Sequence, residues 1–145
     1  MRFDTSFETV MRRCGDPRRP HGWINEDFVR AYAGLHRLGW AHSVETWQDG
    51  RLVGGLYGVA LGRLFHGESM FHLKADASKV GFATLVARLQ ACGYFLIDCQ
   101  MPTPHLASLG AFSADRAEFL EVVKAYRDVP PTGDAFAPIP ASDAT

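Results

Sequence analysis

Two carboxylates and one carboxamide are the residues of this chain best suited to chemistry at an amine. Asp98 and Gln100 belong to the run IDCQ at residues 97–100, and Glu68 belongs to FHGESMF at residues 65–71. Side chains alternate across a strand, so Asp98 and Gln100 would share one face. If the two runs are neighbouring strands, both acids line one cleft that can receive a cationic amine and accept its proton. An acid in an apolar strand is usually paired or functional, and the residues alone favour structural pairing.

Other catalytic and metal-binding patterns are missing from the sequence. It has no G-x-S-x-G elbow of a serine hydrolase, and its six histidines show no H-E-x-x-H or related zinc spacing. His42 and His66 are expected to be core or surface residues rather than ligands. The three cysteines form no C-x-x-C, which is typical of reduced thiols in a cytosolic protein. We therefore expect neither a nucleophilic serine nor a metal site.

A helix and three strands are predicted in the first half of the chain. Asn25 can cap a helix that Gly39 ends. Its predicted inward face consists of Phe28, Ala31, Tyr32, Leu35 and Leu38. Strand patterns at 41–47, 52–60 and 63–71 follow, with turns between them, and predict an antiparallel meander. The second strand contains Gly54, Gly55 and Gly58, which indicate close approach of a ligand or tight packing of a helix, and both interpretations stay open.

A crossover is expected to bring the two acidic runs together. Residues 76–92 predict a helix, with Val80, Ala83, Leu85, Val86 and Leu89 facing inward and Gly93 ending it. Residues 94–100 predict a buried strand, so strand, helix and strand imply parallel pairing. A last helix is predicted at 116–126. The fold class is α+β, an α/β sandwich compatible with the GNAT type of acyltransferase.

Composition limits the number of domains and the kinds of partner. We expect one domain over residues 1–128, followed at 129–145 by a proline-rich segment that its composition predicts to be disordered. The net charge of −1 is not that of a protein that wraps long nucleic acid, so any RNA contact should be local. The four arginines at 12–19 form either a phosphate contact or a solvated loop. No signal peptide or membrane-spanning run is evident.

Eight short segments, in order along residues 20–120, resemble the leucyl/phenylalanyl-tRNA–protein transferase family. They read GWI at 22–24, AY with LH at 31–36, AHSVE at 41–45, LVGGLYG at 52–58, GESMF at 67–71, ASK at 77–79, IDCQ at 97–100 and SLGA at 108–111. One such segment would be a weak signal, whereas eight in order are a strong one.

The resemblance implies a GNAT-like fold and a defined reaction. Leu or Phe, and Met weakly, would move from its tRNA to the N-terminal Arg or Lys of an acceptor protein, which creates a degradation signal. The tRNA ester is already activated, so aminoacyl-tRNA is a co-substrate and no metal, ATP or other cofactor is expected. The resemblance further implies a cytoplasmic protein, and we expect a monomer.

The same resemblance assigns roles to individual residues. Gln100 would orient the acceptor α-amine, while Asp98 would hold Gln100 and help the proton leave. Glu68 would bind the acceptor. The pocket for the leucyl or phenylalanyl side chain would be lined by Trp23, Phe65, Met70 and Ile97, with Ser69 close to it.

The chain also departs from the family pattern. The family carries a smaller N-terminal domain, which we expect to be absent from this chain, and His72-Leu73 and Asp76 replace the usual Ser-Arg and Asn. Asp76 could simply cap the following helix. Two alternatives therefore remain, namely a transferase with a small-molecule amine as acceptor, and a domain that binds aminoacyl-tRNA or protein N-termini without turnover. An acetyl-CoA enzyme is less expected because residues 73–80 contain no glycine.

Overall fold

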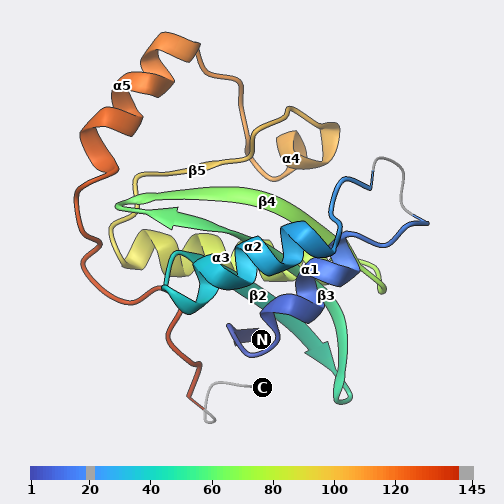
Figure 1. Cartoon of the computed structure of the whole chain (residues 1–145). Coiled ribbons are helices and arrows are strands. Elements are labelled where there is room, and N and C mark those ends of the chain that lie inside the picture. The colour runs from blue at the N-terminus through green and yellow to red at the C-terminus, as the bar shows by residue number, and fades with distance from the viewer. Residues whose placement is uncertain (19–21, 141–145) are drawn as a thin grey trace.

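A computed structural model describes residues 1–18 and 22–140 of the chain. Within these residues, helices cover both faces of a single mixed sheet (Figure 1). In chain order the elements are β1 (Arg2–Phe3), α1 (Phe7–Cys14), α2 (Glu26–Arg37), β2 (Ala41–Gln48), β3 (Arg51–Leu61), β4 (Leu64–His72), α3 (Ala77–Ala91), β5 (Leu96–Asp98), α4 (Pro104–Ser108) and α5 (Arg116–Tyr126). The α+β class is therefore confirmed.

The sheet has the order β1-β2-β3-β4-β5, and its first four strands are antiparallel. This confirms the predicted meander, whose strand bounds differ from the prediction by one residue at most ends. The last pair, β4 and β5, is parallel and joined through α3, so the predicted crossover is present. The parallel pairing puts His66 opposite Asp98 and Phe65 opposite Ile97.

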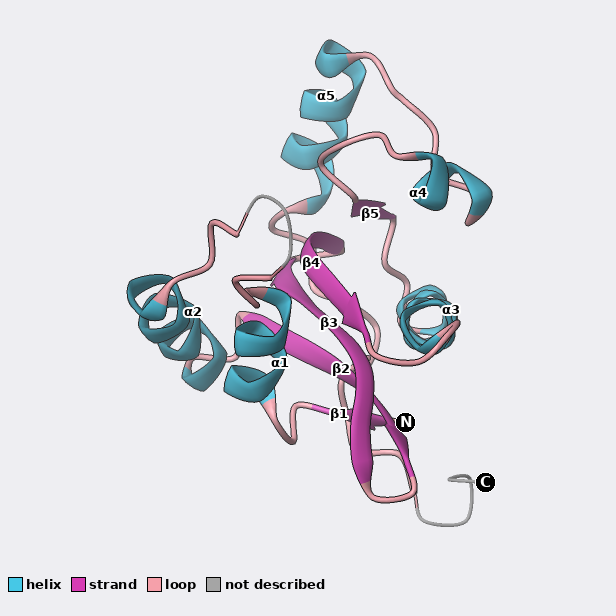
Figure 2. Ribbon diagram, turned by 90° about the vertical axis from the view of Figure 1, so that its right-hand side faces the viewer, coloured by secondary structure: helices cyan, strands magenta, loops and turns pink. Residues whose placement is uncertain are grey.

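Two layers of helices bury two separate clusters of core residues (Figure 2). On one face, α3 packs on a cluster that includes Phe65, Leu85 and Leu89. On the other face, α1 and α2 cover a cluster that includes Val10 and Tyr57. Because side chains alternate along each strand, neighbouring residues of β4 and β5 face different clusters.

Helix α2 begins as predicted but turns another face inward. The Asn25 side chain accepts a hydrogen bond from the Phe28 backbone N–H at 3.1 Å, which satisfies an otherwise unpaired donor. The predicted face is wrong in part, since Leu38 is 73% exposed while Val29 and Ala33 are buried. Apolar residues lie on both sides of α2. The side with the smaller residues faces inward because it lets the helix lie closer to the layer beneath it.

Helix α3 also differs from its predicted face. Val80 is 51% exposed, and the buried residues include Ser78, Gly81, Leu85 and Leu89. Small residues line the first turns because the helix lies close to the sheet there. A Cβ on Gly54 would stand 2.7 Å from the Ala77 Cβ, so tight helix packing accounts for that glycine.

The strand predicted at residues 94–100 is shorter and less buried than expected. Strand pairing covers only Leu96–Asp98, and all three residues are partly exposed. Gln100 lies beyond the strand with a φ of +64°, a left-handed conformation that non-glycine residues seldom adopt. The expectation that Asp98 and Gln100 share one strand face is therefore wrong.

The proline-rich segment packs against the sheet over residues 129–140, in contrast to the predicted disorder. Phe136 is only 6% exposed, and its ring stacks on His42 with centroids 3.7 Å apart. The Arg88 guanidinium donates hydrogen bonds to the carbonyls of Ala135 and Ala137 at 2.6 and 2.7 Å. Composition misses such a segment because an aromatic anchor and several hydrogen bonds to backbone carbonyls hold it. Residues 141–145 lie outside the described part of the chain.

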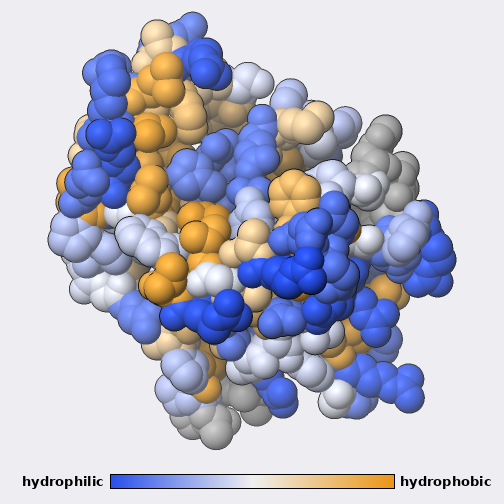
Figure 3. Space-filling model, viewed as in Figure 1, coloured by the Kyte–Doolittle hydropathy of each residue, from blue (hydrophilic) through white to orange (hydrophobic). Residues whose placement is uncertain are grey.

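Helix α5 has the predicted bounds and stands apart from the two helical layers (Figure 1). The Asp115 side chain caps it by accepting from the backbone N–H groups of Ala117 and Glu118. Tyr126 connects it to the body, since its ring stacks on Phe95 at 4.1 Å. In the space-filling view, apolar side chains gather along α5, and hydrophilic ones cover much of α1 and α2 (Figure 3).

Candidate active site

A cavity opens at the point where β4 and β5 separate. The two strands pair only from Leu64↔Leu96 to His66↔Asp98, after which β4 continues to His72 and the other chain segment turns away. The resulting cavity has a volume of about 210 Å³ and a mainly apolar lining. It is lined by Leu56, Tyr57, Phe65, Gly67, Glu68, Ser69, Met70, Phe82, Leu85, Ile97, Cys99, Thr103, His105 and Leu106.

The size of the cavity indicates what can enter it. Pockets for drug-sized ligands span roughly 300–1,000 Å³, and this smaller cavity has a size suited to one apolar side chain. The sequence-predicted pocket residues Phe65, Ser69, Met70 and Ile97 all line it.

Trp23, the fifth predicted pocket residue, lies elsewhere. It is 44% exposed, and its ring packs edge-on against Phe28 at 5.3 Å near the start of α2. It is not among the residues that line the cavity in the described part of the chain. Its assignment came from the family pattern, and no contact in this structure supports it.

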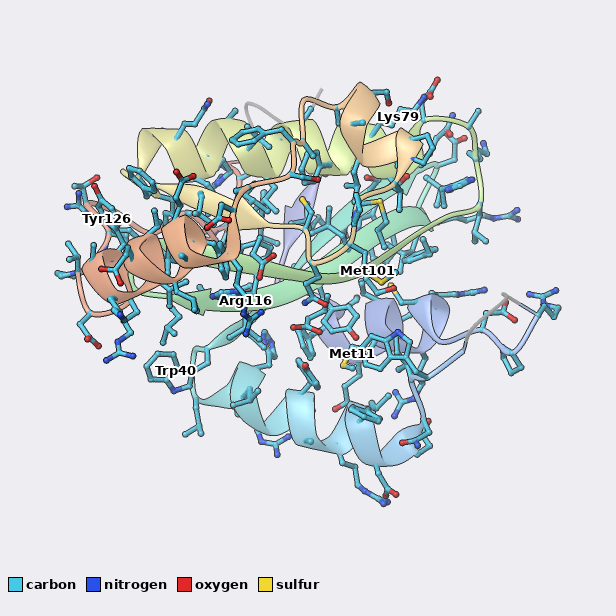
Figure 4. All side chains as sticks on the ribbon, turned by 90° about the horizontal axis from the view of Figure 1, so that it is seen from above. Met11, Trp40, Lys79, Met101, Arg116 and Tyr126 are labelled. Carbon is cyan, nitrogen blue, oxygen red and sulfur yellow. The ribbon has the colours of Figure 1, made fainter. Side chains whose placement is uncertain are left out.

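Helix α4 closes one side of the cavity and was not predicted from the sequence. It begins at Pro104 after Thr103, whose hydroxyl accepts from the Leu106 backbone N–H at 3.1 Å. Viewed from above, Met101 in the preceding turn lies between α3 on one side and α1 and α2 on the other (Figure 4). The Thr-Pro pair is a recognisable helix start that sequence reasoning could have used to find this wall.

A bulge places Glu68 at the cavity. Between β3 and β4 the register passes from Gly58↔Gly67 to Tyr57↔Ser69, so Glu68 is the extra residue. A Cβ on Gly58 would stand 2.2 Å from the His66 carbonyl oxygen, which explains the glycine beside the bulge. The bulge directs the carboxylate, and alternation alone would not predict its direction.

Two tyrosines surround this carboxylate. Burial, and after it the charge of Glu68 and a hydrogen bond with it, raises the pKa of Tyr32 to about 12. Burial also raises the pKa of Tyr57, with smaller contributions from Cys14, Glu68 and Tyr32. The Tyr57 side chain is fully buried, and its hydroxyl has no hydrogen-bond partner among the described residues. An unpaired buried hydroxyl costs about 1–3 kcal/mol, so this hydroxyl lowers the stability of the ligand-free protein.

Asp98 lies beside the cavity and is held at both oxygens. Its Oδ1 accepts the Gln100 backbone N–H at 2.8 Å, and its Oδ2 lies 3.2 Å from His66 Nδ1. The structural pairing that the sequence favoured for Asp98 is thus present. The family resemblance implied that Asp98 holds Gln100 as its catalytic partner. In the structure, the Asp98 carboxylate contacts the backbone N–H of Gln100. Neither Asp98 nor Gln100 is among the cavity-lining residues.

The apolar and acidic groups lie on different faces of the sheet. Phe65 and Ile97 pack in the α3 cluster, and alternation therefore directs His66 and Asp98 toward the α1 and α2 side. Tyr57 belongs to the cluster on that second side. The cavity, which Ile97 and Tyr57 both line, therefore reaches residues of both clusters.

Glu45 is a second acidic position, and its surroundings differ from those of Glu68. It is fully buried in β2. One oxygen accepts the backbone N–H groups of Thr5 and Ser6 at 2.9 and 2.7 Å and the Ser43 hydroxyl at 3.0 Å. The other oxygen accepts the Thr5 hydroxyl and the Trp47 indole N–H. This carboxylate is saturated with donors and fixes the start of α1.

The Cys99 thiol lines the cavity. Burial, followed by the charge of Asp98, raises the pKa of the Cys99 thiol, which disfavours a nucleophilic thiolate. Among residues 1–18 and 22–140, no group of three or more His, Cys, Asp or Glu side chains could hold a metal ion. No helix in that same part is long and apolar enough to cross a membrane.

The arginine-rich segment is partly neutralised by its own carboxylates. Arg12 lies in α1 and pairs with Glu8 and Glu26, both at 3.1 Å, and Arg18 pairs with Asp16 at 2.6 Å. These pairs favour the solvated interpretation over a preformed phosphate site for two of the four arginines. Arg19 lies outside the described residues.

Fold and site together define an α+β protein with a pocket for one apolar side chain beside a carboxylate, in the gap between two parallel strands. Comparison with known families agrees with that class. Residues 1–124 match the family model described as leucyl/phenylalanyl-tRNA protein transferase. The chain belongs to this family, which confirms the resemblance seen in the sequence.

Curated relatives named leucyl/phenylalanyl-tRNA–protein transferase match most of the chain. One from Pseudomonas aeruginosa is 54% identical over 134 residues, which cover 91% of this chain and 59% of the relative. One from Azotobacter vinelandii is 54% identical over 93% of this chain and 61% of the relative. One from Aromatoleum aromaticum is 57% identical over 82% of this chain and 51% of the relative. The chain thus spans between about half and three-fifths of the length of these relatives.

Proposed function

We propose that this chain carries the catalytic site of an aminoacyl-tRNA–protein transferase. It moves Leu or Phe, and Met weakly, from its tRNA to the N-terminal Arg or Lys of an acceptor protein, and so creates a degradation signal. The observation that carries the proposal is the mainly apolar cavity of about 210 Å³ between β4 and β5, which Glu68 also lines, in a chain of this family.

The donor side of the proposal rests on the apolar wall. Phe65, Met70 and Ile97 would contact the leucyl or phenylalanyl side chain from the α3 side, with the ester at the gap between the strands. An apolar pocket discriminates by only about 1–3 kcal/mol per methylene. Acceptance of Leu and Phe, with Met as a weaker donor, follows from such a wall.

The acceptor side rests on the polar groups of the opposite face. The Glu68 carboxylate lines the cavity and would attract the cationic N-terminal residue. An ion pair in a partly enclosed site is less screened than one in water. The preference for Arg or Lys at the acceptor N-terminus is part of this proposal.

The reaction needs no activated cofactor. The acceptor α-amine attacks the ester carbonyl carbon, a C–N bond forms, the bond to the ribose oxygen breaks, and the amine proton ends on that oxygen. An amine with an unperturbed pKa of about 8 has a useful neutral fraction near pH 7. Gln100 would orient the amine, and Asp98 would assist proton departure, an effect typically worth about 10²–10⁴-fold. Holding both substrates together supplies much of the remaining acceleration.

The finer assignments belong to the same proposal. Parallel strands that pair over three residues and then separate around a cavity support the GNAT-like acyltransferase fold. Aminoacyl-tRNA acts as co-substrate, no metal or other cofactor takes part, and the protein works as a monomer in the cytoplasm. Trp23 keeps its family-based place as a prediction for the donor site.

The test is transfer of labelled leucine from Leu-tRNA to a peptide with N-terminal Arg. We expect label in the peptide, and we expect Asp98→Ala to lower the rate at least about 10²-fold while the protein stays folded. Asp128→Ala, at an exposed position after α5, is the matched control.

Other outcomes of this assay separate the alternatives. Deacylation by a small amine without peptide labelling would favour a small-molecule acceptor. Binding of aminoacyl-tRNA without any product would favour a non-catalytic domain. Full activity of Asp98→Ala would remove Asp98 from the proposed mechanism.

A further inference from the structure

His66 and Asp98 form a pair at the residue where the sheet opens. They are register partners in the last bridge between β4 and β5. Their side chains lie on the same face, His66 Nδ1 is 3.2 Å from Asp98 Oδ2, and 22% and 24% of the two side chains are exposed. The sequence pattern favoured a core or surface position for His66, without a functional role.

The pair belongs to a chain of contacts that ends at Gln100. Because Oδ2 faces His66, Oδ1 is turned to the Gln100 backbone N–H at 2.8 Å. That bond holds Gln100 at a φ of +64°, a conformation that costs energy for a residue with a side chain. An Asp98 side chain without the His66 contact could rotate and release this turn.

We infer that His66 is a positioning residue, whose Nδ1–H orients the Asp98 carboxylate so that Asp98 fixes the turn carrying Gln100. The inference rests on the proposed function for its kinetic consequence, since Asp98 and Gln100 act there on the acceptor amine. A carboxylate accepts and does not donate, so the pair requires the proton on Nδ1. His66 itself transfers no proton.

Substitutions can distinguish this geometry from a general packing role. Asn places an N–H donor near the position of Nδ1, Gln places one near the position of Nε2, and Leu has no donor. We expect His66→Leu and His66→Gln to lower kcat for leucine transfer by about 10–100-fold, as for one lost hydrogen bond to a charged group. The KM for aminoacyl-tRNA should change little, and His66→Asn should recover most of kcat.

A matched control comes from the same strand. His72 ends β4 and is exposed, so His72→Asn should leave kcat unchanged. Equal kcat values for wild type, His66→Leu and His66→Gln would overturn the inference. Equal losses in His66→Asn and His66→Leu would also overturn it, because they would indicate packing rather than a placed donor.

A readout without activity separates this inference from the proposed function. In ¹⁵N NMR spectra of the full chain, His66 should carry its proton on Nδ1 at neutral pH. The Gln100 backbone amide resonance should move toward higher field in His66→Leu and stay in place in His66→Asn. Suppose that wild type transfers no leucine, but the His66 and Gln100 signals behave as expected. The proposed function then fails, while the positioning contact stands. An unchanged Gln100 resonance in His66→Leu overturns the positioning contact whatever the activity.

Discussion

Two acidic regions of this molecule illustrate how structural and functional carboxylates differ. Around Glu45, five donors from β2 and the start of α1 surround one fully buried carboxylate. Around Glu68, a bulge places the carboxylate at a cavity, with the Tyr32 hydroxyl beside it. Saturated polar groups fix the fold, whereas incompletely paired ones beside a cavity are available to a ligand.

The largest effect is expected at the saturated acid. Glu45→Ala would leave backbone and side-chain donors of Thr5, Ser6 and Trp47 without their acceptor. Each unpaired buried group costs about 1–3 kcal/mol, so the free energy of unfolding should fall by about 3–5 kcal/mol. Urea denaturation measures this. A loss below about 1 kcal/mol would mean that Glu45 is not the anchor of α1.

The opposite pattern is expected at the cavity acid. Glu68→Gln should raise the KM for an N-terminal Arg peptide by about 10–100-fold, as for a lost hydrogen bond to a charged group. Its free energy of unfolding should stay within about 1 kcal/mol of wild type. Steady-state kinetics and urea denaturation measure the two effects. Glu121→Gln, on the exposed side of α5, is the control. An unchanged KM would remove Glu68 from acceptor binding.

A smaller change in the free energy of unfolding, in the stabilising direction, is expected for Tyr57→Phe. Tyr57→Phe removes a buried hydroxyl that lacks a partner among the described residues, so the free protein should be equally stable or more stable by about 1 kcal/mol. Affinity for the acceptor peptide should stay near that of wild type, because the hydroxyl is shielded from the cavity in the free protein. Calorimetric unfolding and peptide titration on the same samples test both halves. A clear loss of stability would indicate that the hydroxyl is already bonded in the free protein.

The smallest expected effect is a dependence on alkaline pH. The pKa of Tyr32 is raised to about 12, above the unfolded value near 10. The folded state therefore disfavours the Tyr32 phenolate. The contribution of the neutral Tyr32 phenol to the free energy of unfolding is fully present below pH 10 and is lost as the pH rises toward 12. Tyr32→Phe should flatten that decline in thermal unfolding curves measured between pH 9 and 11. An identical decline in the variant would assign it to other groups.

Sequence patterns predicted the elements well because strong local signals mark them. Asn25 and Gly39 bound α2, the meander strands alternate, and α5 runs over the predicted residues. Helix faces were harder to predict, since the small Gly81 and Ala33 lie inward only because of how the layers pack. The packed segment at Phe136 was missed because its anchor is a long-range contact.

The candidate site was predictable in its residue types and less so in its geometry. The apolar residues Phe65 and Ile97 meet because β4 and β5 are parallel neighbours, which the crossover rule predicts. The left-handed turn at Gln100 and the bulge at Glu68 depend on local backbone geometry, which strand alternation does not describe. The contact of His66 with Asp98 depends on the register of the parallel pair, which the sequence pattern leaves open.

The proposed mechanism depends above all on entry of the leucyl side chain into the cavity between β4 and β5. The sharpest test uses an adenosine whose 3′ position carries leucine through an amide in place of the ester. Intermolecular NOEs are then recorded to methyl-labelled protein. We predict NOEs from the leucyl methyls to Met70 and Ile97 and none to Ile24, which packs in the other cluster. Ile97→Trp should abolish them. Binding with NOEs elsewhere, or binding that Ile97→Trp leaves unchanged, would show that the donor side chain does not enter this cavity.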